Sequence, residues 1–145
     1  MQWQFEWYGA EAREDIYREL RQRVAAATYH LQGEIIERVS GQGSGQTYDV
    51  PGTNRTYTAS APGQPPAVLF GLLKNSIKVD FSETQDVIKS TVGVRKNVPY
   101  AMRLEFGFIG RDVRGRMYHQ APRPFFKVTY EHNRQRMIDI MQRGV

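Results

Sequence analysis

Apolar residues between positions 10 and 39 recur at the three- and four-residue steps of an α-helix. They are Ile16, Leu20, Val24, Ala27, Leu31 and Ile35. This spacing places them on one stripe of a helix, and acidic residues fall in the first turns, where the helix dipole favours anions. A helix over 10–39 is about 45 Å long at 1.5 Å per residue. We expect it to extend past its own core toward a neighbouring subunit; the alternative is two shorter helices broken near Gly33.

Three further stretches alternate with the period of a β-strand. Residues 2–8 place their aromatic side chains on one face, which predicts a strand that the long helix covers. These side chains are Trp3, Phe5 and Trp7. Residues 76–81 and 87–94 alternate on either side of a polar turn at 82–86, which predicts an antiparallel hairpin. Its inward-facing residues are predicted to be Ile77, Val79, Phe81, Ile88, Ser90, Val92 and Val94.

Further helices are predicted in the second half of the chain. Residues 71–75 have the pattern of a single helical turn. Pro99 suits the first turn of a short amphipathic helix, and Pro124 suits the first position of a C-terminal helix over 125–142. The residues expected to pack from the C-terminal helix are Phe126, Met137, Ile138 and Met141.

These elements predict an α+β fold, in which a long N-terminal helix and a C-terminal helix pack on an antiparallel β-sheet, with a long Gly/Pro-rich extended loop. The length of 145 residues fits a single domain spanning 1–145. The absence of cysteine excludes disulfides and thiolate metal sites. No apolar run approaches the roughly 20 residues of a membrane span, and the N-terminus lacks a signal-peptide pattern. The net charge of +5 permits a polyanionic partner without requiring one.

Glycine and proline are concentrated in residues 41–67. The first part, up to Thr58, is typical of a flexible linker, and it lacks the Gly-Lys-Ser/Thr and the following helix of a phosphate-binding loop. Prolines stiffen the second part, and Gly63 supplies a bend. Because a stiff segment loses little entropy on docking, we predict an arm over 41–67 that becomes ordered on assembly; the alternative is an ordered connection within one subunit. The subunit-interface candidates are Tyr57, Pro62, Gly63, Pro65, Pro66 and Phe70.

Residues 107–119 have the pattern of a second, protruding hairpin. Three arginines surround Gly115 at its tip, namely Arg111, Arg114 and Arg116. Guanidinium groups bind carboxylates and phosphates in a bidentate manner. We therefore predict that this arginine hairpin contacts an acidic neighbouring subunit or DNA in a channel; the alternative is a solvated turn.

The chain offers few groups for catalysis. His30, His119 and His132 lie in different predicted elements, without the spacing of metal ligands. Glu105 stands among apolar residues with no partner nearby in the sequence, so an ion pair or a hydrogen bond to a loop backbone is favoured over an acid–base role. No serine has the setting of a nucleophile elbow. We therefore expect no enzyme activity, no cofactor and no metal.

Several short runs of proline, glycine and aromatic residues follow one another in a particular order. They are Tyr57–Ala67, Gly71–Ile77, Val98–Ala101, Leu104–Gly107 and Ala121–Phe126. In order and spacing they resemble the tail-completion family (head–tail joining or neck proteins) of long-tailed, siphovirus-type double-stranded-DNA bacteriophages. That family is similar in role to the minor tail protein Z of lambdoid phages. The chain departs from the family at residues 69–71, where an Asp-Thr-Gly-type turn is usual, so the local capping there differs.

The resemblance implies a structural virion protein at the head–tail junction, assembled in the host cytoplasm. Family members form a ring at the head-proximal end of the tail, and a hexamer is expected because tail tubes are six-fold. The ring would join the tail terminator to the head-closure proteins and let genomic DNA pass through its lumen. Such a ring needs two complementary surfaces on each subunit, for which we expect the arm and the arginine hairpin. The alternative is a small basic nucleic-acid-binding protein that uses the same arginines and Lys96, although no reader motif is present.

Overall fold

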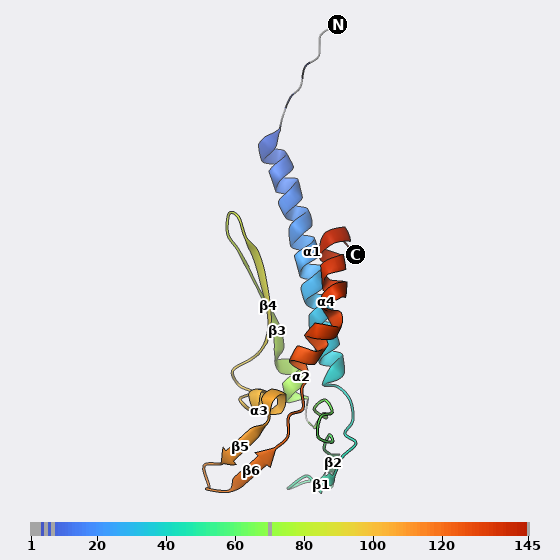
Figure 1. The fold of residues 1–145 in the computed structure, drawn as a ribbon, viewed down its shortest axis with the longest axis vertical. Helices are drawn as coiled ribbons and strands as arrows, with labels where there is room; N and C mark the ends of the chain where they lie inside the picture. The colour runs from blue at the N-terminus through green and yellow to red at the C-terminus, as the bar shows by residue number, and fades with distance from the viewer. Residues whose placement is uncertain (1–3, 5, 7, 70, 145) are drawn as a thin grey trace.

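The computed structural model describes residues 4, 6, 8–69 and 71–144. Over these residues the chain forms four helices and three antiparallel two-stranded sheets, which confirms the α+β class (Figure 1). Each pair of strands is a hairpin of its own, and the three pairs do not join into one sheet. In chain order the elements are α1 (Gly9–Arg38), β1 (Thr47–Asp49), β2 (Thr56–Thr58), α2 (Leu72–Ser76), β3 (Ile77–Glu83), β4 (Ile88–Val94), α3 (Tyr100–Phe106), β5 (Phe108–Arg111), β6 (Met117–Gln120) and α4 (Phe126–Arg143).

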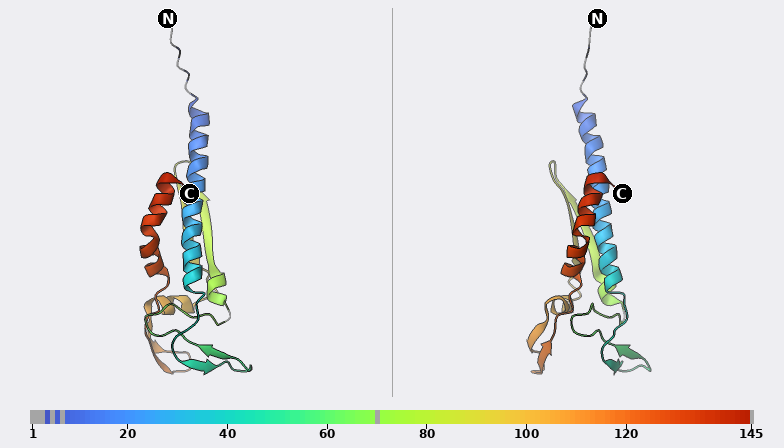
Figure 2. Two further views of the ribbon diagram at one scale, coloured as in Figure 1. Left: turned by 90° about the vertical axis from the view of Figure 1, so that its right-hand side faces the viewer. Right: turned by 45° about the vertical axis from the view of Figure 1, so that its right-hand side comes forward.

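The first helix is continuous over its 30 residues, so the predicted long helix is confirmed and the alternative of a break at Gly33 is wrong. Its N-terminal end extends beyond the rest of the molecule, as the views in Figure 2 show, and the β3–β4 turn reaches along it as far as Arg13. A Cβ added at Gly33 would meet nothing within 4 Å, so this glycine marks neither a bend nor a close contact. We call residues 9–20 the projecting half of α1, and the opposite end of the molecule, with β1–β2 and β5–β6, the base.

The hydrophobic core lies around the C-terminal part of α1. It is built from residues of α1, α2, β3 and α3 and of the segments beside them, namely Leu31, Ile35, Val39, Leu73, Ile77, Val98, Ala101 and Phe125. Phe125 and Ile35 are 1% and 0% exposed, and burying such a side chain stabilises the fold by about 1.5–3 kcal/mol. Phe125 was not among the residues expected to pack. The predicted helix began at Phe125, whereas in the structure this residue precedes α4 as its N-cap.

Two elements flank α1 along its length. On one side α4 runs beside it, with Nε2 of His30 2.9 Å from Oδ1 of Asn133. On the other side lies the β3–β4 hairpin, where Nε2 of Gln32 donates to the carbonyl oxygen of Ile77 at 2.9 Å. The helix α1 is therefore the scaffold to which both α4 and the β3–β4 hairpin are attached, and its C-terminal end lies at the base.

The β3–β4 hairpin has the predicted position and antiparallel pairing. Ile77 pairs with Val94 at its buried end, next to the core. Phe81 was expected to point inward, but it is 47% exposed. Its ring lies 5.7 Å from that of Tyr29 on α1, so only one side of the ring is covered. The outer half of the hairpin is exposed because α1 contacts it on one side only, through side chains such as Tyr29 and Arg21.

The last helix begins later than predicted. Phe125 is its N-cap residue, so Pro124 lies before the helix and not at its first position. The buried residues of α4 are Thr129 and Ile140, whereas Met141, which was expected to pack, is 40% exposed. Only part of the surface of α4 faces α1. Ile140 is covered there, whereas Met141, the next residue along the helix, is not.

The predicted strand over residues 2–8 falls largely outside the described residues. Gln4, Glu6 and Tyr8, which are described, belong to no strand. Tyr8, directly before α1, is 61% exposed.

Candidate assembly site

The arm (residues 41–67) forms part of the base and folds against the rest of its own subunit. Its glycine-rich part contains the β1–β2 hairpin, in which Tyr48 pairs with Tyr57. The N–H of Gly45 donates to the carbonyl of Ala59 at 2.7 Å, and the N–H of Val68 donates to the carbonyl of Gly41 at 3.1 Å. The prediction of a flexible linker up to Thr58 is therefore wrong for this region. Backbone pairing across the two ends of the segment, which composition does not reveal, gives it structure.

Glycine is required at one position of the arm because two backbone segments meet there. A Cβ placed on Gly43 would lie 1.9 Å from the carbonyl oxygen of Thr58 and 2.4 Å from that of Ala59. By contrast, a Cβ on Gly41 would meet nothing within 4 Å. The close approach at Gly43 fixes the path by which the chain returns toward the core.

The proline-rich part of the arm turns and attaches to the segment before α4. The N–H of Gln64 donates to the carbonyl of Ala61 at 3.0 Å, and Gly63 has a φ of 79°. Proline followed by a positive-φ glycine in this turn is the type II pattern, so the predicted bend at Gly63 is confirmed. The N–H of Gly63 then donates to the carbonyl of Pro122 at 3.1 Å.

The six interface candidates of the arm occupy different environments. Pro62 and Gly63 are exposed on the turn, while Pro65 is half-buried. Pro66 is buried and Tyr57 is half-buried. Phe70 lies outside the described residues. Among these candidates the turn residues are therefore the most exposed, while Tyr57 and Pro66 line a pocket.

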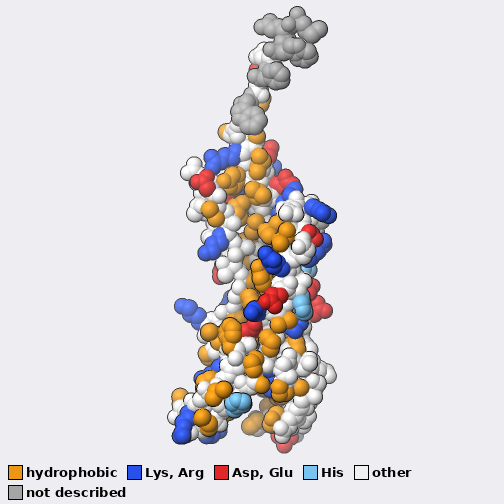
Figure 3. Space-filling model, viewed as in Figure 1, with side chains coloured by type: hydrophobic (Ala, Val, Ile, Leu, Met, Phe, Trp, Pro, Cys, Tyr) orange, Lys and Arg blue, Asp and Glu red, His pale blue; other side chains and the backbone are white. Residues whose placement is uncertain are grey.

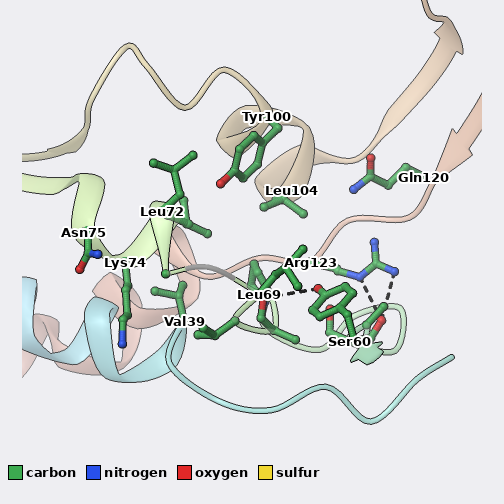
Figure 4. A pocket seen from close by; sticks show the side chains of 17 residues that line it. Val39, Ser60, Leu69, Leu72, Lys74, Asn75, Tyr100, Leu104, Gln120 and Arg123 are labelled. Atoms are coloured by element: carbon green, nitrogen blue, oxygen red, sulfur yellow. Dashed lines mark hydrogen bonds between the residues drawn. The ribbon is translucent and has the colours of Figure 1, made fainter. Parts of the chain in front are cut away.

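That pocket has a volume of about 690 Å³ and lies between the arm, α2 and α3 (Figure 4). Apolar side chains dominate its lining, with large contributions from Val39, Leu69, Leu72, Tyr100 and Leu104. Three of these are also substantially exposed: Leu69 at 44%, Leu72 at 47% and Tyr100 at 40%. The lining includes Lys74 and Arg123 but neither aspartate nor glutamate. An apolar concavity with a few cationic groups at its margin can bind an aromatic or aliphatic group that carries negative charge.

Arg123 fixes one wall of the pocket. Its Nε and Nη2 both donate to the carbonyl oxygen of Ser60, at 3.2 and 3.1 Å, and its N–H donates to the carbonyl of Leu104 at 2.6 Å (Figure 4). The hydroxyl of Tyr57 donates to the carbonyl of Ala67 at 3.4 Å. Burial raises the pKa of Tyr57, against the opposing effect of the Arg123 charge. The phenol therefore stays a neutral hydrogen-bond donor near neutral pH.

Glu105 connects α3 to the start of α4. Its Oε2 accepts from the N–H groups of Phe125 and Phe126 at 2.9 and 3.0 Å, and its Oε1 accepts from that of Lys127 at 2.9 Å. The predicted hydrogen bond to backbone is confirmed. A carboxylate on the free N–H groups of a helix N-terminus satisfies them and interacts favourably with the helix dipole. The residue has a structural role that sequence spacing could not specify, because its partners are 20 or more residues away.

The second predicted hairpin is confirmed as β5–β6. At its tip, Oδ1 of Asp112 accepts from the N–H groups of Arg114 and Arg116, both at 2.9 Å, and Oδ2 pairs with Nη2 of Arg116 at 2.7 Å. Although partial burial opposes the shift, these hydrogen bonds hold the pKa of Asp112 below its usual value. Arg116 is thus used to order the turn. Arg111 and Arg114 are exposed, and within the described part of the chain they form no ion pair.

Exposed apolar side chains lie on the same hairpin and on the neighbouring helix α3. Met102 and Phe106 on α3 are each 69% exposed, Ile109 is 70% exposed, Met117 is 68% exposed and Val113 is fully exposed. Figure 3 shows hydrophobic and basic side chains mixed at this end of the molecule. We call these five residues the basal apolar patch. This patch was not predicted from the sequence, although four of the five residues lie within two residues of an arginine between positions 102 and 117.

The two surfaces expected to complement each other lie at the same end of the molecule. The β1–β2 and β5–β6 hairpins both extend from the base, opposite the N-terminus (Figures 1 and 2). Gln120 of β6 even contributes to the pocket that the arm encloses. A head-to-tail contact joins two different surfaces, and the two hairpins extend to different sides of the base, so their role as complementary surfaces stays a prediction.

Among the described residues, no group of three or more histidine, aspartate or glutamate side chains is placed to hold a metal ion. Within the same part of the chain, no helix is sufficiently long and apolar to cross a membrane. No family model, curated protein or solved structure matches the chain.

Proposed function

We propose that the chain is a structural virion protein of the phage head–tail connector. Copies form a ring, expected to be a hexamer, at the head-proximal end of the tail. The ring joins the tail terminator to the head-closure proteins and lets genomic DNA pass. The support is the order of the proline, glycine and aromatic runs, together with a subunit whose shape suits assembly. In this proposal the long helix α1 and the C-terminal helix α4, packed on β3–β4, are the family scaffold, and the Gly/Pro-rich arm is its assembly element.

The observation that carries the assembly role is the amount of surface the subunit exposes. Its accessible surface is 11038 Å². A compact monomer of 16.7 kDa has about 7,600 Å². The excess is of the size that permanent protein–protein interfaces bury, about 2,000–5,000 Å² in total. A chain that spends so much of its length on projecting elements gains stability when copies cover them.

Apolar residues mark two separate surfaces suited to such contacts. The basal apolar patch is one of them. The projecting half of α1 is the other, with Ile16 57% and Leu20 41% exposed on its apolar stripe. Monomeric proteins rarely expose contiguous apolar patches of more than a few hundred Å². Two different surfaces at opposite ends permit a heterologous contact, which generates a closed ring when the rotation between neighbours closes.

Imaging of the purified protein by negative-stain electron microscopy, alone and with purified tails, tests this proposal. We expect rings, and density added at the head-proximal end of tails. Ile109→Glu should prevent ring formation because it places a charge in the basal apolar patch. The matched control is Tyr130→Glu, at a 42% exposed residue of α4 away from both surfaces, and it should leave rings intact. Monomers that never bind tails would contradict the proposal.

The exposed arginines separate the connector from a nucleic-acid-binding protein. If the chain binds DNA as its function, affinity should fall with salt by a log–log slope of about −0.9 per phosphate contacted, and Arg111→Glu with Arg114→Glu should abolish binding. The connector role predicts weak binding by isolated subunits, since DNA only transits the assembled lumen. A titration at two salt concentrations distinguishes the two.

A further inference from the structure

The pocket at the base lacks a cover among the described residues of its own subunit. Its volume of about 690 Å³ falls in the range of about 300–1,000 Å³ typical of ligand sites. Leu69, Leu72 and Tyr100 remain 40–47% exposed at its margin. Large apolar side chains converging on an open concavity favour an occupant that is itself apolar and large enough to fill it.

The N-terminal segment, residues 2–8, has the chemistry to fill that space. Three aromatic residues alternate with polar ones along it, namely Trp3, Phe5 and Trp7. Aromatic anchors in a desolvated pocket supply most of the binding energy of many interfaces. The segment's one charged side chain is Glu6, and the pocket lining carries Lys74 and Arg123 without any acidic residue. The charges are therefore complementary.

A subunit cannot place this segment in its own pocket. The segment precedes Gly9 at one end of α1, whereas Val39, directly after the other end, lines the pocket. Thirty helical residues separate the two by about 45 Å. Eight extended residues reach at most about 29 Å. Any occupant with this sequence must come from another copy.

We propose that the pocket receives the aromatic N-terminal segment of a second copy of the chain. The contact is heterologous, with the segment of each copy in the pocket of the next, so it repeats until a ring closes. The inference rests on the proposed function in one respect only, namely that copies of the chain assemble head to tail. It assigns the arm a definite part in assembly: Tyr57 and Pro66 help to line the socket for the neighbour's segment.

Tryptophan fluorescence measures this contact without a label. The only two tryptophans of the chain, Trp3 and Trp7, lie in the segment. As the protein concentration rises, we expect emission to move to shorter wavelength in parallel with the increase in mass seen by mass photometry. Leu72→Glu, at an exposed position of the pocket margin, should weaken association about tenfold or more, because it removes an apolar contact and repels Glu6. Val87→Glu, away from the pocket, should have no effect.

A mixing experiment tests whether the segment of one copy enters the pocket of the next. A segment variant, Trp3→Ala with Phe5→Ala and Trp7→Ala, keeps the pocket, and Leu72→Glu keeps the segment. Each alone should remain monomeric, and their mixture should stop at a 1:1 pair. Emission that does not change with concentration, or a segment variant that assembles like the unmodified chain, would overturn the inference. So would an unmodified pocket that co-purifies with a small apolar molecule. Binding to tails is scored separately, so rings that form without the segment would still leave the connector role standing.

Discussion

The two halves of α1 carry the same apolar stripe, but the stripe is buried in only one of them. In the half near the base, Leu31 and Ile35 are 5% and 0% exposed. In the projecting half, Ile16 and Leu20 lie on the continuation of that stripe and are 57% and 41% exposed. The helix is continuous through both halves, so local conformation does not cause the difference. What differs is the presence of other elements against the stripe.

Element length explains where cover ends. The neighbouring helix α4 has 18 residues against 30 in α1, which leaves about 18 Å of α1 without a helical partner. Contacts there are polar: the hydroxyl of Tyr17 donates to the carbonyl of Gln85 at 2.8 Å. Exposed polar contacts contribute little stability. The apolar stripe therefore indicates which face of α1 can be buried, but not what buries it. In the half near the base the same chain covers it, and in the projecting half, we propose, another copy does.

Truncating an apolar side chain of the stripe should change the free energy of unfolding most, and the size of the change should depend on where along α1 the residue lies. Ile35→Ala removes a fully buried side chain and should lower the free energy of unfolding by about 2–5 kcal/mol. Ile16→Ala, on the same stripe, should change it by no more than about 0.5 kcal/mol and should instead weaken self-association. Urea denaturation of dilute protein measures the first effect and mass photometry the second. Equal losses of stability in both variants would show that the projecting half is covered within the monomer.

Next in size is a pair of glycine substitutions in the arm. Gly43→Ala brings a Cβ against the backbone of Thr58 and should cost about 1–3 kcal/mol, because the arm must shift. Gly41→Ala meets open space and serves as its control. Hydrogen exchange across residues 41–67 should increase only in the Gly43 variant. Unchanged exchange in both would mean that the arm is not held against the base.

A moderate loss is expected where α3 caps α4. Glu105→Ala leaves three N–H groups at the start of α4 without their acceptor and should cost about 2 kcal/mol. Glu131→Ala, on the exposed face of the same helix, should cost well under 1 kcal/mol, since it loses one exposed contact to Lys127 at 3.8 Å. Thermal unfolding of the two variants, measured side by side, checks the difference. A cap of no consequence would give them the same midpoint.

The smallest effect belongs to the ion pair that joins α1, directly after its projecting half, to the β3–β4 hairpin. Nε and Nη2 of Arg21 each lie 2.7 Å from an oxygen of Glu83, and this hydrogen bonding lowers the pKa of Glu83. A lowered folded-state pKa gives stability that is present above the unfolded pKa of about 4.3 and is lost as pH falls through the folded value.

Arg21→Ala should therefore reduce stability slightly near neutral pH, and the difference from the unmodified chain should disappear in acid. Urea midpoints of both proteins at about pH 7 and about pH 3 test the sign. Arg136→Ala, at an exposed arginine of α4 that forms no ion pair within the described part of the chain, controls for loss of a positive surface charge. A difference that grows as pH falls would contradict the assignment.

The sequence predicted most helices and both longer hairpins because each depends on neighbours within a few residues. Periodicity alone placed α1, β3–β4 and the last helix to within one or two residues. It failed at β1–β2, where Gly45 pairs with Ala59 across a glycine-rich segment that composition marks as flexible. The pocket was not predicted either, since it is lined by residues from Val39 to Arg123.

By itself, then, the sequence determined the type and order of the elements, the apolar face of each helix and the class of residue at each turn. Only the tertiary structure decided which part of that face lies in the core, which carboxylate caps α4 and which arginine forms an ion pair with Asp112. The physical reason is that propensity and periodicity act over a few residues, whereas burial depends on where distant elements end. Because α4 ends before α1 does, one stripe became both a core and an exposed surface.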